Sequence, residues 1–232
     1  MSEGVTFGLV HGAQHGAWCW ERLVPELERL GHGAVAVDLP CDDPDATIDT
    51  YASCVVDALA EHDDVVLVGH SLGSLTIPVV ARRRPVRRLV FLCSVPTGPG
   101  PAIDTELASM VTPEFANASR TFDEHGCESL ADADAVTVWY DDCPAEDARR
   151  AVERLRPQSR RPLTEPTPLD EWPDVPVSVV LGRDDRCVNM EWAVAAATAR
   201  TGESPILLPG GHSPFLGRPG ELAEVLVGLA VT

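Results

Sequence analysis

The chain has 232 residues, with 36 acidic against 18 basic side chains and a formal net charge of −18 at pH 7. This length suits a single domain with a full hydrophobic core. The negative charge argues against nucleic acids and anionic membrane surfaces as partners, because both are polyanions that would repel the protein. All 18 basic residues are arginine, so no lysine is available for a Schiff base with a substrate or with pyridoxal phosphate.

The seven cysteines are scattered and contain no Cys-x-x-Cys pair. The first residues lack the basic start and apolar middle of a signal peptide, and no apolar run reaches the roughly 18 residues of a membrane span. We therefore expect a cytoplasmic protein with reduced thiols. We expect no metal and no cofactor, since Gly12 and Gly16 make the stretch around His11 and His15 a loop and not a ligand-bearing helix face. A homodimer stays open as the assembly.

Apolar runs and amphipathic stretches alternate along the first part of the chain. In order, the pattern predicts a strand at 5–10, a helix at 17–30, a strand at 34–37, a helix at 47–62, a strand at 65–68, a helix at 72–83 and a strand at 87–93. This alternation implies a parallel sheet covered by helices on both faces. Because a glycine loop is reached by residue 11, we expect no N-terminal antiparallel hairpin and a sheet of six parallel strands.

Residues 94–169 interrupt the alternation. This stretch is rich in proline, and its weak helical patterns at 105–111, 129–139 and 145–155 have no clear strand between them. We expect an irregular, mainly helical insertion, with residues 1–94 and 170–232 as the core and residues 95–169 as a cap. After it the pattern predicts a strand at 176–181, a helix at 190–199, a strand at 205–208 and a helix at 219–229.

Residues 65–73, Val-Val-Leu-Val-Gly-His-Ser-Leu-Gly, join a buried strand to a Gly-x-Ser-x-Gly turn and a helix. This pattern is typical of the nucleophile elbow, in which a strained backbone exposes a serine hydroxyl above the end of a sheet. Gly69 and Gly73 leave room where a β-carbon would strike the neighbouring strand or helix. The motif predicts Ser71 as a nucleophile.

A serine hydroxyl is a poor nucleophile unless a base accepts its proton and an acid orients the base. His212 lies in a glycine-rich loop after the last expected strand and is the only histidine beyond residue 125. The acid should follow the strand at 176–181, where Gly-Arg-Asp-Asp-Arg supplies two candidates. Adjacent residues point in different directions, so only one can face His212; we favour Asp185, because Asp184 suits a turn cap.

The oxyanion formed in acyl transfer needs two preorganised donors. We predict the backbone N–H of Leu72, directly after the nucleophile, and that of Ala13 in the loop after the first strand. His11 and Gly12 of that loop, together with Trp139 of the insertion, are the predicted substrate contacts. Six mostly apolar residues of the insertion either line the pocket or form the insertion's own small core, and the sequence leaves both open: Val111, Phe115, Phe122, Val138, Trp139 and Tyr140.

Two segments carry a family resemblance. Residues 9–20, Leu-Val-His-Gly-Ala-Gln-His-Gly-Ala-Trp-Cys-Trp, resemble the His-Gly-Ala-x-His-Gly-Ala-Trp-x-Trp opening of α/β-hydrolases of the hydroxynitrile lyase and plant methylesterase group. Residues 209–215, Pro-Gly-Gly-His-Ser-Pro-Phe, are similar to a segment of related bacterial hydrolases. The resemblance implies an α/β-hydrolase fold with the insertion as a cap. It implies a triad of Ser71, His212 and Asp185 with Ala13 and Leu72 as oxyanion donors.

The leading hypothesis is a serine hydrolase that cleaves a carboxylic ester or lactone of a small to medium-sized substrate through an acyl-enzyme. The alternatives are a specialised biosynthetic hydrolase or cyclase with the same triad, and a ligand-binding receptor that keeps the triad without turnover. A complete triad fits all three, because substrate choice lies in the cap. Cyanohydrin cleavage is disfavoured, since the lyases carry a lysine directly after the catalytic histidine and this chain has Ser213 there.

Overall fold

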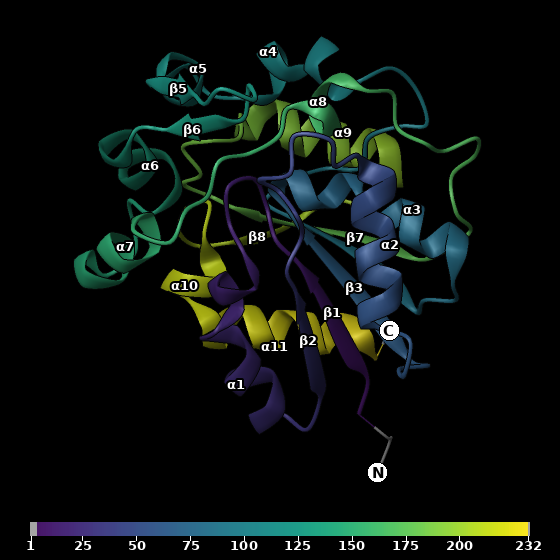
Figure 1. Ribbon diagram of the computed structural model, residues 1–232. Coiled ribbons are helices and arrows are strands. Elements are labelled where there is room, and N and C mark those ends of the chain that lie inside the picture. The colour runs from purple at the N-terminus through teal and green to yellow at the C-terminus, as the bar shows by residue number, and fades with distance from the viewer. Residues whose placement is uncertain (1–3, 232) are drawn as a thin grey trace.

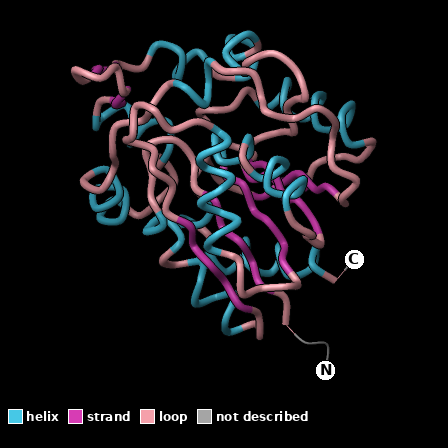
Figure 2. Tube along the Cα trace, turned by 45° about the vertical axis from the view of Figure 1, so that its right-hand side comes forward, coloured by secondary structure: helices cyan, strands magenta, loops and turns pink. Residues whose placement is uncertain are grey.

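The structure is a computed structural model that describes residues 4–231, and its centre is one six-stranded sheet in the order β2-β1-β3-β4-β7-β8. The strands are β1 (Thr6–Val10), β2 (Gly33–Val37), β3 (Val65–His70), β4 (Arg88–Leu92), β7 (Val177–Gly182) and β8 (Ile206–Leu208). Every neighbouring pair in this sheet is parallel (Figures 1 and 2). The predicted α/β class and the six parallel strands are confirmed, and residues 1–3 lie outside the described part.

Helices cover both faces of the sheet (Figure 1). One face is packed by α1 (Leu23–Arg29) and α11 (Pro219–Ala230), the other by α2 (Ile48–Ala58), α3 (Ile77–Arg83) and α9 (Met190–Thr201). All six residues of β3 are buried, and successive side chains join the two different cores, as the alternation of a strand requires. Among residues 4–231, no helix combines the length and the apolar character needed to span a bilayer.

Two predicted helices are each broken in two. The stretch at 17–30 is a 3-10 turn, η1 (Ala17–Trp20), followed by α1, and the stretch at 72–83 is η2 (Ser71–Leu75) followed by α3. Pro25 lies in the first turn of α1 and Pro78 in the first turn of α3. Proline has no backbone N–H and is tolerated in the first turn but not in a helix interior, so each α-helix starts anew just before its proline.

The insertion contains short elements between β4 and β7. They are η3 (Ile103–Thr105), α4 (Leu107–Met110), α5 (Pro113–Asn117), β5 (Arg120–Phe122), β6 (Glu128–Leu130), α6 (Asp132–Trp139), α7 (Ala145–Val152) and α8 (Arg161–Thr164). The insertion is mainly helical, as predicted, but it also contains two strands that the sequence did not indicate, because β5 and β6 pair as an antiparallel hairpin. The connecting turn is held by the Asp123 carboxylate, which accepts the N–H groups of His125 and Cys127. Strands of three residues are too short to show a period of two in the sequence.

The strand register brings four distant loops together at the carboxyl edge of the sheet. Val10 at the end of β1 pairs with Gly69 of β3, so the loop at residues 11–16 leaves the sheet beside the serine turn. Gly182 of β7 pairs with Leu208 of β8, which brings the loops at 183–189 and 209–213 together. The order reverses around β1, with β2 on one side and β3 on the other, and open α/β sheets bind ligands at such a switch point. The last short helix, α10 (Pro214–Gly217), follows the loop at 209–213.

Candidate active site

The turn after β3 holds Ser71 in a strained conformation. Its φ of 48° lies in the left-handed region, which residues with a β-carbon rarely adopt. A β-carbon on Gly69 would lie 2.8 Å from Ser74 Cα, and one on Gly73 would lie 2.3 Å from the carbonyl oxygen of His11. Both clashes are with backbone atoms, which confirms the predicted steric reason for the two glycines.

The next pair of groups is the Asp185 carboxylate and the His212 imidazole, whose Oδ2 and Nδ1 atoms lie 2.8 Å apart. Both side chains are 1 % exposed. The second carboxylate oxygen, Oδ1, accepts the backbone N–H of Cys187 at 2.7 Å and that of Val188 at 2.9 Å. Three hydrogen bonds therefore fix the carboxylate and, through it, the plane and tautomer of the histidine.

Asp184 performs a different task. Its Oδ2 accepts the N–H of Gly210 at 3.2 Å, and its own N–H donates to the Gly210 carbonyl at 3.0 Å. Gly210 has a φ of 93°, which favours glycine, so these bonds hold a tight turn two residues before the histidine. Asp185, not Asp184, is the carboxylate that contacts His212.

The electrostatics favour the protonated form of His212. Burial by itself lowers the pKa of His212, but the neighbouring Asp185 carboxylate outweighs this and raises the pKa well above its ordinary value. The imidazolium is therefore stabilised when the ring accepts a proton. Among residues 4–231 the Ser71 hydroxyl makes no direct hydrogen bond to His212, a contact that is often long in an active site without substrate.

His70, which directly precedes Ser71, contacts the loop that carries His212. Its Nε2–H donates to the carbonyl oxygen of His212 at 2.9 Å, and the two rings lie 4.8 Å apart. Burial lowers the pKa of His70 well below its ordinary value, so this ring stays neutral. The sequence analysis did not assign His70 a role; its only signal was its place inside the serine motif.

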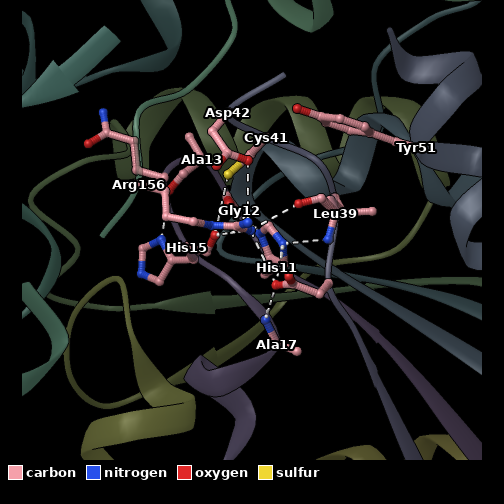
Figure 3. Close-up of polar contacts among 12 residues, drawn as sticks. His11, Gly12, Ala13, His15, Ala17, Leu39, Cys41, Asp42, Tyr51 and Arg156 are labelled. Atoms are coloured by element: carbon pink, nitrogen blue, oxygen red, sulfur yellow. Dashed lines mark hydrogen bonds and ion pairs between the residues drawn. The ribbon is translucent and has the colours of Figure 1, made fainter. Parts of the chain in front are cut away.

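His11 holds the loop after β1 (Figure 3). Its Nε2 accepts the N–H of Leu39 at 2.9 Å, so Nδ1 carries the proton and donates to the Gly12 carbonyl at 2.8 Å. This tautomer requires a neutral ring, and burial lowers the pKa of His11 to about 4. In a trans peptide the C=O and N–H point in opposite directions, so the bond to Gly12 also directs the Ala13 N–H.

Ala13, Ser71 and Leu72 line one cavity. The Ala13 N–H has no acceptor among residues 4–231. The Leu72 N–H belongs to the first turn after β3, where helical N–H groups lack partners of their own. The two predicted donors and the serine therefore share one space.

The cavity has a volume of about 570 Å³, within the range of small-molecule sites. It lies between the insertion and the carboxyl edge of the sheet, and most of its wall is apolar. Its larger apolar residues are Leu72, Leu75, Val95, Ile103, Leu107, Met110, Val111, Phe115, Phe122, Leu130, Trp139, Leu163, Val188 and Trp192. Its polar and charged residues include Gln14, Asp104, Arg120, Glu128, Gln158 and Arg160. Such a wall suits an apolar molecule with a few polar groups.

Residues 9–225 match the model of the alpha/beta hydrolase family. The chain belongs to the α/β hydrolase family. A probable esterase, PIR7A of Oryza sativa subsp. indica, is 27% identical over 98% of this chain and 97% of its own length. A pyrethroid hydrolase of Sphingobium wenxiniae is 28% identical over 96% of this chain and 86% of its own. The crystal structure of polyneuridine aldehyde esterase shares the fold, with a TM-score of 0.84 at 20% identity over 98% of this chain and 99% of that one.

The site of this α/β hydrolase differs from expectation at His11 and Gly12. Neither lines the cavity: His11 is 1 % exposed with both ring nitrogens bound inside the protein. A β-carbon on Gly12 would lie 2.8 Å from His70 Nδ1 and 3.0 Å from Ser71 Cβ, so this glycine permits close packing against the serine turn. Both residues shape the site and neither faces its interior.

The six apolar residues of the insertion divide between the two possibilities left open by the sequence. Trp139 lines the cavity, as do Val111, Phe115 and Phe122. Val138 and Tyr140 are each 1 % exposed and pack in the core below. Trp139, the last residue of α6, is 4 % exposed and also packs in this core, so it differs from Val138 and Tyr140 in lining the cavity as well.

One set of potential metal ligands occurs among the described residues, formed by His70, Cys93 and His212, whose ligand atoms lie within 4.8 Å of one another. Two of these groups already have partners, since His212 Nδ1 is bound to Asp185 and His70 Nε2 to the His212 carbonyl. The cluster is better explained as the buried support of the histidine loop in this α/β hydrolase than as a metal centre.

Proposed function

We propose that the protein hydrolyses carboxylic esters or lactones of small to medium size through an acyl-enzyme on Ser71. The observation that carries this is the buried Asp185–His212 pair at the sheet edge where Ser71 lines the cavity. Relatives named esterase and pyrethroid hydrolase support the ester-cleaving activity.

The proposed reaction has two halves. His212 accepts the proton of the Ser71 hydroxyl while Oγ attacks the ester carbonyl, and the N–H groups of Ala13 and Leu72 bind the resulting oxyanion. As the intermediate collapses, the C–O bond to the alcohol breaks and His212 gives its proton to the departing oxygen. His212 then deprotonates a water that attacks the acyl-enzyme, which releases the carboxylic acid and restores the serine.

Hydrolysis is favoured over cyanohydrin cleavage. Ser213, which stands where the lyases carry a lysine, is fully buried and uncharged. With no lysine in the chain, a cation for a leaving cyanide would have to come from arginine. Ester hydrolysis needs only the triad and two backbone donors, all of which this proposal already assigns.

We further propose that residues 95–169 act as a cap on a core of residues 1–94 and 170–232, with Trp139 among the substrate contacts. This is supported by the cavity, whose wall combines residues from both parts. A cytoplasmic location is also proposed, since all seven cysteines are free and reduced thiols are usual in that compartment. A homodimer is compatible with this proposal but is not required by it.

A panel of p-nitrophenyl esters of graded acyl length tests the activity, with Ser71→Ala as the background control. We expect turnover by the wild type, an initial burst where deacylation is slower than acylation, and labelling by a serine-directed organophosphate at Ser71 alone. Labelling is read by mass spectrometry of the digested protein. Cyanohydrin cleavage well above ester hydrolysis would overturn the assignment, and labelling without turnover of any ester would favour the receptor.

Trp139→Ala should change the preference for acyl length, because the indole occupies cavity wall. We expect the rate ratio between long and short esters to rise at least severalfold, as the enlarged cavity admits longer chains. Val138→Ala, which removes a buried neighbour outside the cavity, is the matched control and should lower stability without moving that ratio. Equal ratios in both variants would mean that Trp139 serves only the core.

A further inference from the structure

We infer that Gln158 and Arg156 of the insertion are positioning residues that hold the Ala13 N–H in its catalytic orientation. The inference rests on the proposed function, because it assigns these two side chains to the support of the oxyanion site. It makes the insertion part of the catalytic apparatus and not only a cover over the cavity.

The starting observation is the backbone of Gln14, directly after Ala13. Its φ is 63°, a conformation that residues with a β-carbon rarely adopt and that persists only where surrounding contacts impose it. Gln14 is 4 % exposed, and its side-chain Oε1 accepts the N–H of Leu130 in β6 at 3.0 Å. The strained residue is thus anchored to the insertion, more than a hundred residues away in the chain.

Gln158 supplies the second anchor. Its Oε1 accepts the N–H of Gln14 at 3.2 Å, while its Nε2 donates to the hydroxyl of Tyr51 at 3.0 Å and to the carbonyl of Ser159 at 2.8 Å. The side chain is almost fully buried. Because the Ser159 carbonyl can only accept and the Gln14 N–H can only donate, the amide takes the orientation that turns Oε1 toward the loop.

Arg156 supplies the third anchor (Figure 3). Its backbone N–H donates to the Gln14 carbonyl at 2.8 Å, and its Nη2 donates to the carbonyls of His15 at 3.1 Å and Leu39 at 2.9 Å. The N–H of the same Leu39 is bound to His11, so one guanidinium ties together the two segments that frame the loop. Its charge is met by Asp38 at 3.2 Å.

These contacts leave one backbone polar group of the loop free to bind a ligand. The Gly12 carbonyl is bound by His11, the Ala13 carbonyl accepts the Nδ1–H of His15 at 2.7 Å, and Gln14 is held at both its N–H and its carbonyl. Within residues 4–231, the Ala13 N–H is the one polar backbone group between the Gly12 and His15 carbonyls without a partner. Since peptide groups are planar, fixing the peptides on either side fixes where this N–H points.

Gln158→Leu removes the hydrogen bond to the Gln14 N–H and puts an apolar side chain of similar size in place of the amide. We expect kcat on a reactive ester to fall about tenfold to a hundredfold, less than the hundredfold to thousandfold for complete loss of an oxyanion donor. Since Gln158 also lines the cavity, the test is that kcat falls by a larger factor than KM rises, and the affinity for a trifluoromethyl ketone, whose bound oxyanion uses the same donors, should fall in parallel with kcat/KM. If the role of Gln158 were purely structural, the melting temperature would fall, but kcat/KM and the affinity for the ketone would not fall together.

Tyr51→Phe is the matched control, because it removes the hydroxyl at the far end of the same amide and spares the bond to Gln14. It should keep kcat within about threefold. If Gln158→Leu does not fold, Arg156→Met is tested in its place, because this side chain is partly exposed. We expect it to lower kcat and the affinity for the ketone severalfold. Unchanged kcat and ketone affinity in whichever of these two variants folds would overturn the inference. A wild type without Ser71-dependent ester hydrolysis would overturn the proposed function instead.

Discussion

Asp185→Asn should lower turnover of an activated butyrate ester by about ten-thousandfold. The carboxylate now accepts the Nδ1–H of His212 and leaves Nε2 free to take the serine proton. An asparagine amide can donate to Nδ1, which places the ring proton on Nε2 and blocks that step. The loss should appear in kcat, since the substitution does not alter the cavity wall.

Asp184→Asn is the matched control and should keep turnover within about tenfold. Its side-chain oxygen still accepts the Gly210 N–H, so the turn before His212 persists. Both variants are compared by steady-state kinetics after their folding has been checked by thermal unfolding. Equal losses, or a larger loss in Asp184→Asn, would show that the wrong carboxylate has been assigned.

Gly73→Ala should strongly damage both the stability of the protein and its site. The new β-carbon would lie 2.3 Å from the His11 carbonyl oxygen and 2.7 Å from that of Val10, both backbone atoms at the end of β1. Relief requires the loop that carries Ala13 to move away from Ser71. We expect a loss of about 3 kcal/mol in the free energy of unfolding. Because an oxyanion donor is displaced, we also expect kcat to fall by about a hundredfold.

Gly228→Ala provides the comparison for this glycine. It lies in α11, and a β-carbon there would meet nothing within 4 Å. Alanine is the better helix former, so this variant should gain about 0.5–1 kcal/mol and keep full activity. Denaturant unfolding and ester turnover measure both variants. A Gly73→Ala protein as stable and active as Gly228→Ala would contradict the steric account of the serine turn.

The core of the fold could be predicted because its signals are local. The buried run of β3, the alternation of strands and helices and the glycines of the serine turn all lie within short windows, and each predicted strand of the sheet is present. What failed also has a local cause: Pro25 and Pro78 restart helices that their apolar patterns had joined. The hairpin of β5 and β6 has strands too short to leave a period in the sequence.

The order of the motifs along the chain predicted only part of the site. The Asp185–His212 contact was expected from the sequence. His11 was instead predicted to touch substrate, because no local signal shows that its ring nitrogens are bound to Gly12 and Leu39. The bond from Gln14 to Gln158 spans 144 residues; Gln14 stands at the variable position of the opening motif, and Gln158 belongs to no motif. Such contacts depend on how the insertion folds back, which periodicity does not encode.

The buried histidines also give the fold an acid limit. Burial lowers the pKa of His11 to about 4 and that of His15 to about 3, and it lowers the pKa of His70 well below its ordinary value, whereas the unfolded chain titrates near 6.5. Below about pH 6.5 the unfolded chain therefore binds protons on these rings that the native protein does not bind. Each ring then lowers the free energy of unfolding by up to about 1.4 kcal/mol per pH unit.

His212 titrates in the opposite sense, since its raised pKa stabilises the fold at low pH and loses that effect as pH rises through its folded value. Below about pH 6.5 the ring of His212 is protonated in both states and its contribution no longer changes, so the other three rings leave a net loss on further acidification. Set beside a total stability of about 5–15 kcal/mol for a typical domain, that loss grows to a comparable size within a few pH units. The same neutral imidazoles that align the peptide groups of the site therefore confine the native protein to media that are no more than mildly acidic.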